Sequence, residues 1–102
     1  MAGVVRLGDL SAGLEGGVVW PKTAVVNANN STVYADGKLV ATQGGSFDTH
    51  SRGRVTHFVD IQRLITGGSN VVFVENKPVA RSGDSIADTD TCDECSPNVF
   101  AG

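Results

Sequence analysis

Two stretches of the sequence match each other and decide the fold: VYADGKLVATQGG at residues 33–45 and VFVENKPVARSGD at residues 72–84. The offset between them is constant at 39 residues, and they share Val, Lys, Val, Ala and Gly at matched positions. A shorter stretch, GVVRLGD at residues 3–9, matches the end of the second copy at an offset of 75. Because self-similarity at a fixed spacing marks a repeat architecture, we expect one structural unit used three times.

The missing half of the first unit is predicted to lie at the other end of the chain. NVFAG at residues 98–102 resembles TVYAD at residues 32–36, which opens the first full copy. We therefore expect the C-terminal strand to pair beside the N-terminal strand and to close a pseudo-threefold ring. The single domain 1–102 would then hold three units: residues 3–30 completed by 96–102, residues 31–68, and residues 69–95.

Each full copy is predicted to form a β-hairpin. Asp36-Gly37 and Glu75-Asn76 stand between two short apolar segments, and Gly and Asn tolerate the positive φ angles of a type I′ turn. Three ordinary hairpins in a β-sandwich are the alternative. The near-equal offsets of 36 and 39 residues favour stacking around one axis.

Composition supports a small all-β domain. Val, Leu, Ile and Phe supply 27 of 102 residues, above the roughly 20% below which a chain tends to stay disordered. Val is the commonest residue and Gly follows with 13, which favours strands and turns. Only residues 58–65 show helical spacing of apolar side chains, and this stretch fits a strand equally well. The sequence shows no signal-peptide pattern and no membrane-spanning apolar run, and its net charge of −3 argues against a nucleic-acid binder.

A metal site is predicted from the only two histidines and the only two cysteines, His50, His57, Cys92 and Cys95. Cys92 and Cys95 have the C-x2-C spacing of a metal knuckle. Two thiolates and two imidazoles would complete a tetrahedral site, which suits zinc best, with iron as the alternative. A site closed by four protein ligands is structural, because no position is left for a catalytic water.

Other interpretations of these residues remain open. The C-x2-C pair could form a disulfide or redox pair, although a thioredoxin-like site would need a βαβ context. His57 could be an ordinary strand residue. A calcium site lacks its regular 12-residue loop, so we expect a solvated acidic loop from a set of five residues. The set is Asp84, Asp88, Asp90, Asp93 and Glu94.

The second copy resembles the signature of the PAAR-repeat family, which is named for Pro-Ala-Ala-Arg. The matching residues are Pro78, Val79, Ala80, Arg81, Gly83 and Asp84. The other copies depart from this pattern, since Leu39 and Gly3 replace the proline and Thr42 replaces the arginine. With its repeats and both ends, essentially the whole chain fits the resemblance.

The resemblance implies a small cone of three β-hairpin repeats with a metal-tied tip, held by His and Cys residues from the later part of the chain. The wide base would sit on a trimeric spike protein, either a tail spike or a VgrG-like protein, with one chain per trimer. Such proteins tip the spikes of contractile phage tails and type VI secretion systems. The chain would then belong to a virion baseplate, or move from the bacterial cytoplasm outward on a secretion spike. It would touch the target membrane transiently while piercing it.

Physical reasoning points to the same partner. The end of a trimeric β-helix exposes three equivalent sets of strand edges, which a chain with three similar units can meet. We expect strand-edge pairing plus a shallow apolar base. Arg6 and Arg81 would make base or inter-repeat hydrogen bonds, unless they face solvent, and Trp20-Pro21 would serve packing. Six strand valines would supply the core or the base: Val4, Val5, Val33, Val40, Val72 and Val79.

Two rival functions are less well supported. Ser46, Asp48 and His50 could be fragments of a hydrolase triad, but the sequence has no G-x-S-x-G elbow, P-loop or G-x-G-x-x-G. A zinc hydrolase would need three ligands plus water, with Glu94 as the nearby base. The other rival is a zinc-stabilised β-module that binds some other protein. We expect no enzyme activity, no small-molecule substrate and no nucleic-acid partner.

Overall fold

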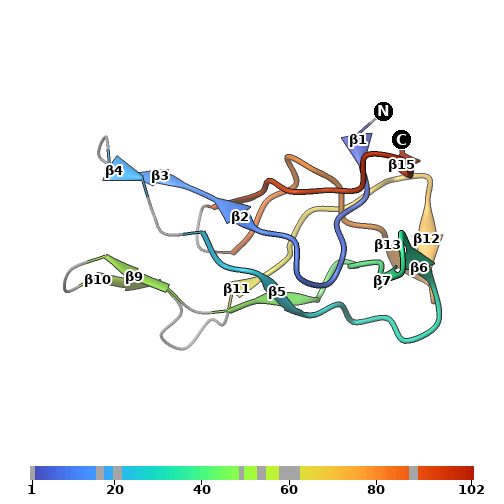
Figure 1. The fold of residues 1–102 in the computed structure, drawn as a ribbon, viewed down its shortest axis with the longest axis horizontal. Coiled ribbons are helices and arrows are strands. Elements are labelled where there is room, and N and C mark those ends of the chain that lie inside the picture. Colours follow the sequence, from blue (N-terminus) through green and yellow to red (C-terminus); the bar gives the residue numbers. More distant parts are fainter. Residues whose placement is uncertain are drawn as a thin grey trace.

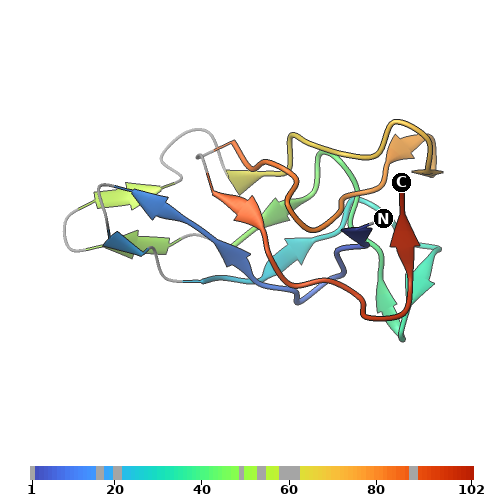
Figure 2. The ribbon, with the colours of Figure 1, turned by 90° about the horizontal axis from the view of Figure 1, so that it is seen from above.

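Very short strands joined by tight turns make up the chain, because β-branched residues alternate with glycine-containing turns along the sequence. The computed structural model describes residues 2–15, 18–19, 22–48, 50–52, 55–57, 63–87 and 90–102. The molecule is elongated, 37 × 24 × 24 Å (Figures 1 and 2). The described residues contain no helix, and accordingly none that could cross a membrane.

The strands are two or three residues long. In chain order they are β1 (Ala2–Gly3), β2 (Ser11–Ala12), β3 (Leu14–Glu15), β4 (Val18–Val19), β5 (Val25–Asn27), β6 (Tyr34–Ala35), β7 (Lys38–Leu39), β8 (Ser46–Phe47), β9 (His50–Arg52), β10 (Val55–His57), β11 (Arg63–Leu64), β12 (Phe73–Val74), β13 (Lys77–Pro78), β14 (Thr91–Cys92) and β15 (Phe100–Ala101).

All strand pairs are antiparallel. β11, β8 and β5 form a three-stranded sheet, and the other sheets are pairs: β1–β15, β2–β14, β3–β4, β6–β7, β9–β10 and β12–β13. β11 includes two residues of the segment that showed helical spacing, whereas residues 58–62 of that segment lie outside the described residues, as does Trp20-Pro21.

The two predicted hairpins are confirmed. Between β6 and β7, Asp36 has φ 55° and Gly37 has φ 80°. Between β12 and β13, Glu75 has φ 52° and Asn76 has φ 64°. Positive φ at both central residues is the signature of a type I′ turn, whose twist suits a two-residue hairpin.

The predicted pairing of the two chain ends is also observed. β1 pairs with β15, with Gly3 opposite Phe100 and Ala2 opposite Ala101. This pair takes the place of a third hairpin beside β6–β7 and β12–β13, at one end of the long axis (Figures 1 and 2). We call these three strand pairs the base.

A closed ring of backbone hydrogen bonds joins the three repeats. The Val5 N–H donates to the Ala80 carbonyl at 2.9 Å, the Ala41 N–H to the Val5 carbonyl at 2.8 Å, and the Ala80 N–H to the Ala41 carbonyl at 3.0 Å. Each repeat therefore donates to one neighbour and accepts from the other. The single-residue bridges around this ring follow the same cyclic order: Val4–Arg81, Arg6–Val40 and Thr42–Val79.

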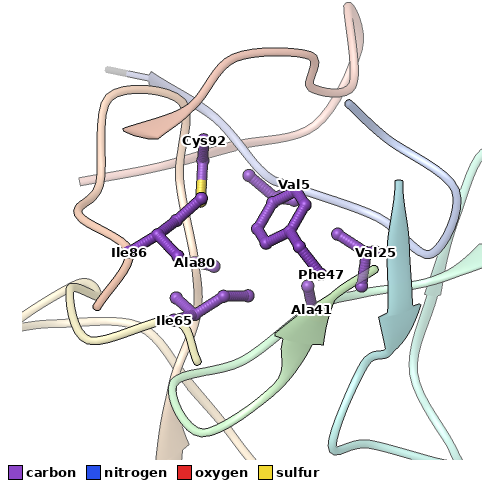
Figure 3. Packing of buried hydrophobic residues seen from close by; sticks show 8 residues of the cluster. All are labelled: Val5, Val25, Ala41, Phe47, Ile65, Ala80, Ile86 and Cys92. Atoms are coloured by element: carbon purple, nitrogen blue, oxygen red, sulfur yellow. The ribbon is translucent and has the colours of Figure 1, made fainter. Parts of the chain in front are cut away.

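Two buried clusters of side chains lie along the axis of the ring. The central cluster (Figure 3) consists of Val5, Val25, Ala41, Phe47, Ile65, Ala80, Ile86 and Cys92. The base cluster consists of Val4, Ala35, Val40, Val79 and Ala101, with Val74 packed against it. Of the six valines expected in the core or the base, four are buried, while Val33 and Val72 are exposed on the base.

Candidate functional site

The three strand pairs of the base are equivalent in register. Tyr34 lies opposite Leu39 in β6–β7, and Phe73 lies opposite Pro78 in β12–β13. Phe100 lies opposite Gly3 in β15–β1. An aromatic residue therefore occupies the same place in each of three strands, although the third strand pair is assembled from both ends of the chain.

The base exposes apolar side chains in a threefold pattern. Each of β6, β12 and β15 presents a valine followed by an aromatic residue, with exposed fractions of 40% and 60% for Val33 and Tyr34, 36% and 54% for Val72 and Phe73, and 40% and 49% for Val99 and Phe100. Val71 adds a seventh exposed apolar side chain at this end. In the described part of the chain, the one other large apolar side chain of this kind is Val26, in β5. A large exposed apolar patch is typical of a docking surface.

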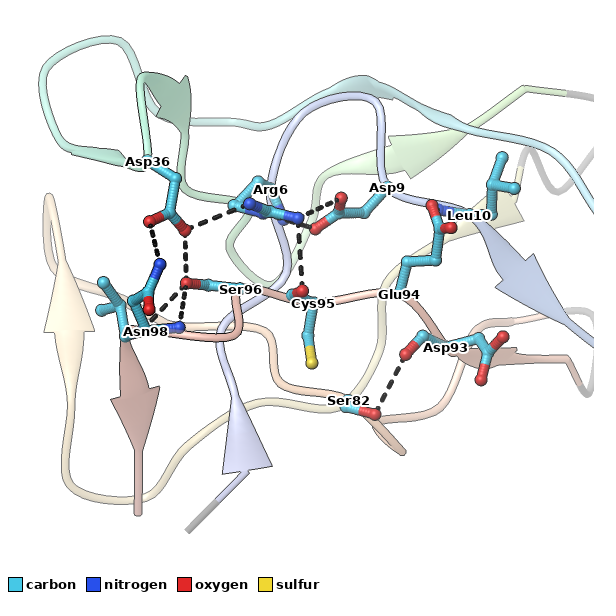
Figure 4. Close-up of polar contacts among 11 residues, drawn as sticks. Arg6, Asp9, Leu10, Asp36, Ser82, Asp93, Glu94, Cys95, Ser96 and Asn98 are labelled. Carbon is cyan, nitrogen blue, oxygen red and sulfur yellow. Dashed lines mark hydrogen bonds and ion pairs between the residues drawn. The ribbon is translucent and has the colours of Figure 1, made fainter.

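The turn of the first hairpin is fastened to a distant part of the chain (Figure 4). The Asp36 carboxylate accepts hydrogen bonds from the Ser96 hydroxyl, from Asn98 Nδ2 at 3.0 Å and from Arg6 at 3.1 Å. These donors, Ser96 first, lower the pKa of Asp36 below its ordinary value, since they favour the charged form.

The second hairpin has an equivalent contact. The Glu75 carboxylate accepts hydrogen bonds from Thr32 Oγ1 at 2.6 Å and from the Ser31 N–H at 3.1 Å. These bonds, with Thr32 the larger cause, lower the pKa of Glu75. In the third unit, the Ser69 hydroxyl donates to the carbonyl of Gly102, the residue that follows β15. Each strand pair of the base is therefore fastened to the next unit around the ring.

Three polar residues begin the exposed strands, and sequence reasoning missed them. Ser96 Oγ accepts the N–H groups of Asn98 and Val99, and Ser69 Oγ accepts those of Val71 and Val72. The Asn30 side chain does the same for Thr32 and Val33. Their signal is a Ser or Asn three residues before each exposed valine, which extends the repeat by three positions.

The family-like motif has a structural role in the last repeat. Arg81 donates to the Asp84 carboxylate from its backbone N–H at 2.7 Å and from its guanidinium at 3.0 Å. Gly83 between them has φ 91°, a conformation that favours glycine. Pro78 lies in β13, and Val79 and Ala80 are buried in the base and central clusters. The motif therefore shapes the turn and the core.

Arg6 and Arg81 both make the hydrogen bonds expected of them. Arg6 binds Asp9 through two guanidinium bonds of 2.9 Å, and also Asp36 and the Cys95 carbonyl (Figure 4). Arg81 binds the Gly68 carbonyl at 3.0 Å besides Asp84. Both arginines thus connect the turn of their own repeat to another part of the chain.

The two cysteines lie in different surroundings. Cys92 is 2% exposed and belongs to the central cluster (Figure 3), where burial raises the pKa of its thiol to about 12. It occupies the place that Val25 and Ile65 take in the other repeats, since Gly8, Gly44 and Gly83 donate to these three carbonyls in turn. Cys95 is half-buried, and its sulfur packs against Gly3 of β1. Both are free thiols, so the structure does not contain the alternative disulfide.

The two histidines face each other in backbone register. His50 opens β9 and His57 closes β10, and the two are paired residues of that hairpin. The hairpin lies at the end of the long axis opposite the base (Figures 1 and 2). Their side chains lie outside what the structure describes, as does Asp88, and the described side chains include no group of three potential metal ligands. Cys92 as described fits a core residue, and the four-residue zinc site stays a prediction.

A small all-β chain of three repeats, closed into a ring and ending in a threefold apolar base, defines a structural capping protein. The chain belongs to the PAAR family, because the PAAR motif family model matches residues 15–93. No curated protein matches the chain. Members of this family are structural components at the tips of spikes in type VI secretion systems and phage tails, and their partner is a spike protein.

Proposed function

We propose that this chain caps the end of a trimeric β-helical spike, with one chain per trimer, and forms the point with which a contractile injection machine pierces a target membrane. The threefold pattern of exposed valine and aromatic pairs on the base carries this proposal. Three identical subunits present the same surface three times around an axis. A single chain can satisfy all three only if it repeats its own contacts, as β6, β12 and β15 do.

The contacts around the base also support a load-bearing role. Asp36, Glu75 and Gly102 fasten each strand pair to the next unit. The strand pairs therefore cannot separate without breaking these bonds. A base that keeps its shape loses little conformational entropy on docking, which strengthens binding.

Co-purification with a spike tests the docking role. The chain would be mixed with a purified trimeric VgrG-like spike from the same machine and analysed by size-exclusion chromatography with light scattering. We expect one chain per trimer. Val33→Asp, Val72→Asp and Val99→Asp in combination should abolish binding, whereas the control Val26→Asp, equally exposed but away from the base, should not. Binding that survives the triple substitution would contradict the proposal.

The proposal includes one structural metal ion, zinc or iron, at the end opposite the base. The pairing of His50 with His57 supports it, since the backbone brings two potential imidazole ligands together. A bound ion would cross-link that end of the molecule. Cys92 and Cys95 are the remaining predicted ligands.

Elemental mass spectrometry on protein purified without a metal-affinity tag tests the metal site and its ligands separately. We expect one ion per chain, which is lost in His50→Ala and His57→Ala. Cys92→Val is the informative variant, because valine fills the equivalent place at position 25. Loss of metal in this variant, with its fold retained, would make Cys92 a ligand; retained metal would make it a core residue only.

A further inference from the structure

The three strands β6, β12 and β15 form the last layer of the molecule along its long axis. Figures 1 and 2 show them at the outer face of the base, with their partners β7, β13 and β1 one layer further in. The layer holds three strand segments: residues 33–35, 72–74 and 99–101. We call it the terminal layer.

The outward edges of the terminal layer carry unused backbone groups. The Val40 N–H donates to the Val33 carbonyl at 3.0 Å, so the Tyr34–Leu39 pair that follows is the non-hydrogen-bonded pair of the ladder. The N–H and carbonyl of Tyr34 therefore point away from β7. Bonds of 3.1 Å from Val79 to Val72 and of 3.0 Å from Val4 to Val99 place Phe73 and Phe100 in the same position.

The inward edges, by contrast, are all used. The carbonyls of Leu39, Pro78 and Gly3, opposite the three aromatic residues, accept N–H groups from the neighbouring repeat at 2.8 to 3.0 Å. No described residue bonds to the backbone of Tyr34, Phe73 or Phe100 across the outward edge. One side of each strand pair thus holds the ring together, and the other side is free.

These edges also lack the usual protection against pairing. Soluble proteins place charged residues or proline on exposed strand edges, or cover them. None of the segments 33–35, 72–74 and 99–101 contains a charged residue or a proline. Three unprotected edges, each with exposed apolar side chains, indicate that another protein covers them.

The side chains of the terminal layer are arranged as in a layer of a trimeric β-helix. Neighbouring residues of a strand point to opposite faces. Ala35 and Ala101 belong to the base cluster on the axis, and Val74 packs against it. Val33, Val72 and Val99, two positions earlier, therefore share that inner face. The aromatic residues point to the outer face.

We infer that the base docks by sheet continuation: the terminal layer pairs its three strand edges with the three free edges at the end of a trimeric β-helix. The backbone N–H and carbonyl of Tyr34, Phe73 and Phe100 would supply the hydrogen bonds. Val33, Val72 and Val99 would continue the apolar core of the helix. The inference rests on the proposed function and adds how the docking works, namely through the main chain and not chiefly through the aromatic rings.

Proline substitution tests the main-chain role directly. Proline removes an N–H, and it is tolerated at a strand edge whose N–H faces away from the partner strand. Tyr34→Pro, Phe73→Pro and Phe100→Pro would be compared with the matched alanine variants, which lose the ring but keep the N–H. The readout is the Kd for a purified trimeric VgrG-like spike. We expect each proline variant to bind about tenfold more weakly than its alanine counterpart.

Hydrogen exchange gives a second measurement that does not depend on how the variants fold. In the free chain, the amides of Tyr34, Phe73 and Phe100 should exchange rapidly, and in the complex with the spike they should become protected. Rapid exchange in the complex, or equal Kd values for proline and alanine variants, would overturn sheet continuation. If the triple Val→Asp variant still fails to bind, the proposed function would survive that result. Loss of neither interaction would overturn both.

A second copy of this chain is the other possible occupant of these edges. Light scattering of the chain alone distinguishes the two. A monomer whose three amides become protected only with the spike supports the proposal. A dimer that protects the same amides without the spike would overturn it.

Discussion

The repeat around Arg81 and the repeat around Thr42 close the same backbone turn with different side chains. Gly83 and Gly44 both have φ 91°. The N–H two residues before the end of each motif follows the same pattern, since Asp84 donates to the Arg81 carbonyl at 3.0 Å and Gly45 to the Thr42 carbonyl at 2.9 Å. The backbone of the turn is therefore common to both repeats.

The side chains differ because the space differs. Asp84 binds Arg81, whereas Thr42 donates its hydroxyl to the Ala28 and Asn29 carbonyls, both at 3.1 Å. A Cβ atom on Gly45 would lie 2.6 Å from the Asn27 carbonyl oxygen, so an aspartate has no room there. The comparison teaches that the fold requires the turn, and that the Arg–Asp pair of the motif is used only where the neighbouring backbone leaves space.

The largest expected effect comes from forcing the motif into the middle repeat. Gly45→Asp, alone or with Thr42→Arg, should lower the free energy of unfolding by about 3 kcal/mol or more, because the new Cβ meets backbone atoms that cannot move aside cheaply. Urea denaturation followed by circular dichroism measures this. A double variant as stable as the original chain would show that the repeats are interchangeable.

The reverse change in the last repeat should cost less. Asp84→Ala leaves the Arg81 N–H without its acceptor, which should cost about 2 kcal/mol of stability. Asp84→Asn keeps an acceptor oxygen and serves as the control, with a smaller loss in the same denaturation experiment. Equal losses in the two variants would mean that charge, and not the backbone contact, matters at this position.

Arg6 and Arg81 should differ in the same direction as their contacts. Arg6→Ala removes bonds to Asp9, Asp36 and the Cys95 carbonyl, whereas Arg81→Ala removes bonds to Asp84 and the Gly68 carbonyl. We expect the Tm of Arg6→Ala to lie roughly 5 °C below that of Arg81→Ala. Scanning calorimetry measures both values, and the opposite order would contradict the importance of the Asp36 contact.

The smallest expected effect is a pH dependence. Since the native pKa values of Asp36 and Glu75 are lowered, both carboxylates stabilise the fold at neutral pH. This contribution should be lost as the pH falls below about 4, the ordinary carboxyl range, toward the lowered native values. The Tm difference between the original chain and Asp36→Asn or Glu75→Gln should therefore shrink in acid. A difference that does not change with pH would exclude an ionic contribution.

The parts of the fold that depend on local pattern could be predicted from the sequence. The repeated Asp36-Gly37 and Glu75-Asn76 turns predicted both hairpins, and the likeness of residues 98–102 to 32–36 predicted the pairing of the ends. The threefold base follows from the same repeats. Positive φ and strand alternation are local properties, so a short segment reveals them.

The contacts that depend on distant residues could not be predicted. Asp36 meets Ser96, 60 residues away, and no local pattern indicates that pairing. Cys92 looked like half of a metal knuckle, yet it occupies the core place of Val25 and Ile65. That equivalence follows from hydrogen bonds to Gly8, Gly44 and Gly83, which only the folded ring reveals.

The split repeat sets the order in which the protein can be made. The pairing of Gly3 with Phe100 joins residues almost a full chain length apart, and the Val4 N–H bonds to the Val99 carbonyl at 3.0 Å. During synthesis the hairpins around residues 36 and 75 can form as soon as they leave the ribosome, but β1 has no partner until β15 emerges. Contacts of such long sequence separation form slowly. The completed base is therefore a product of the finished chain, and a nascent chain presents at most two of its three faces.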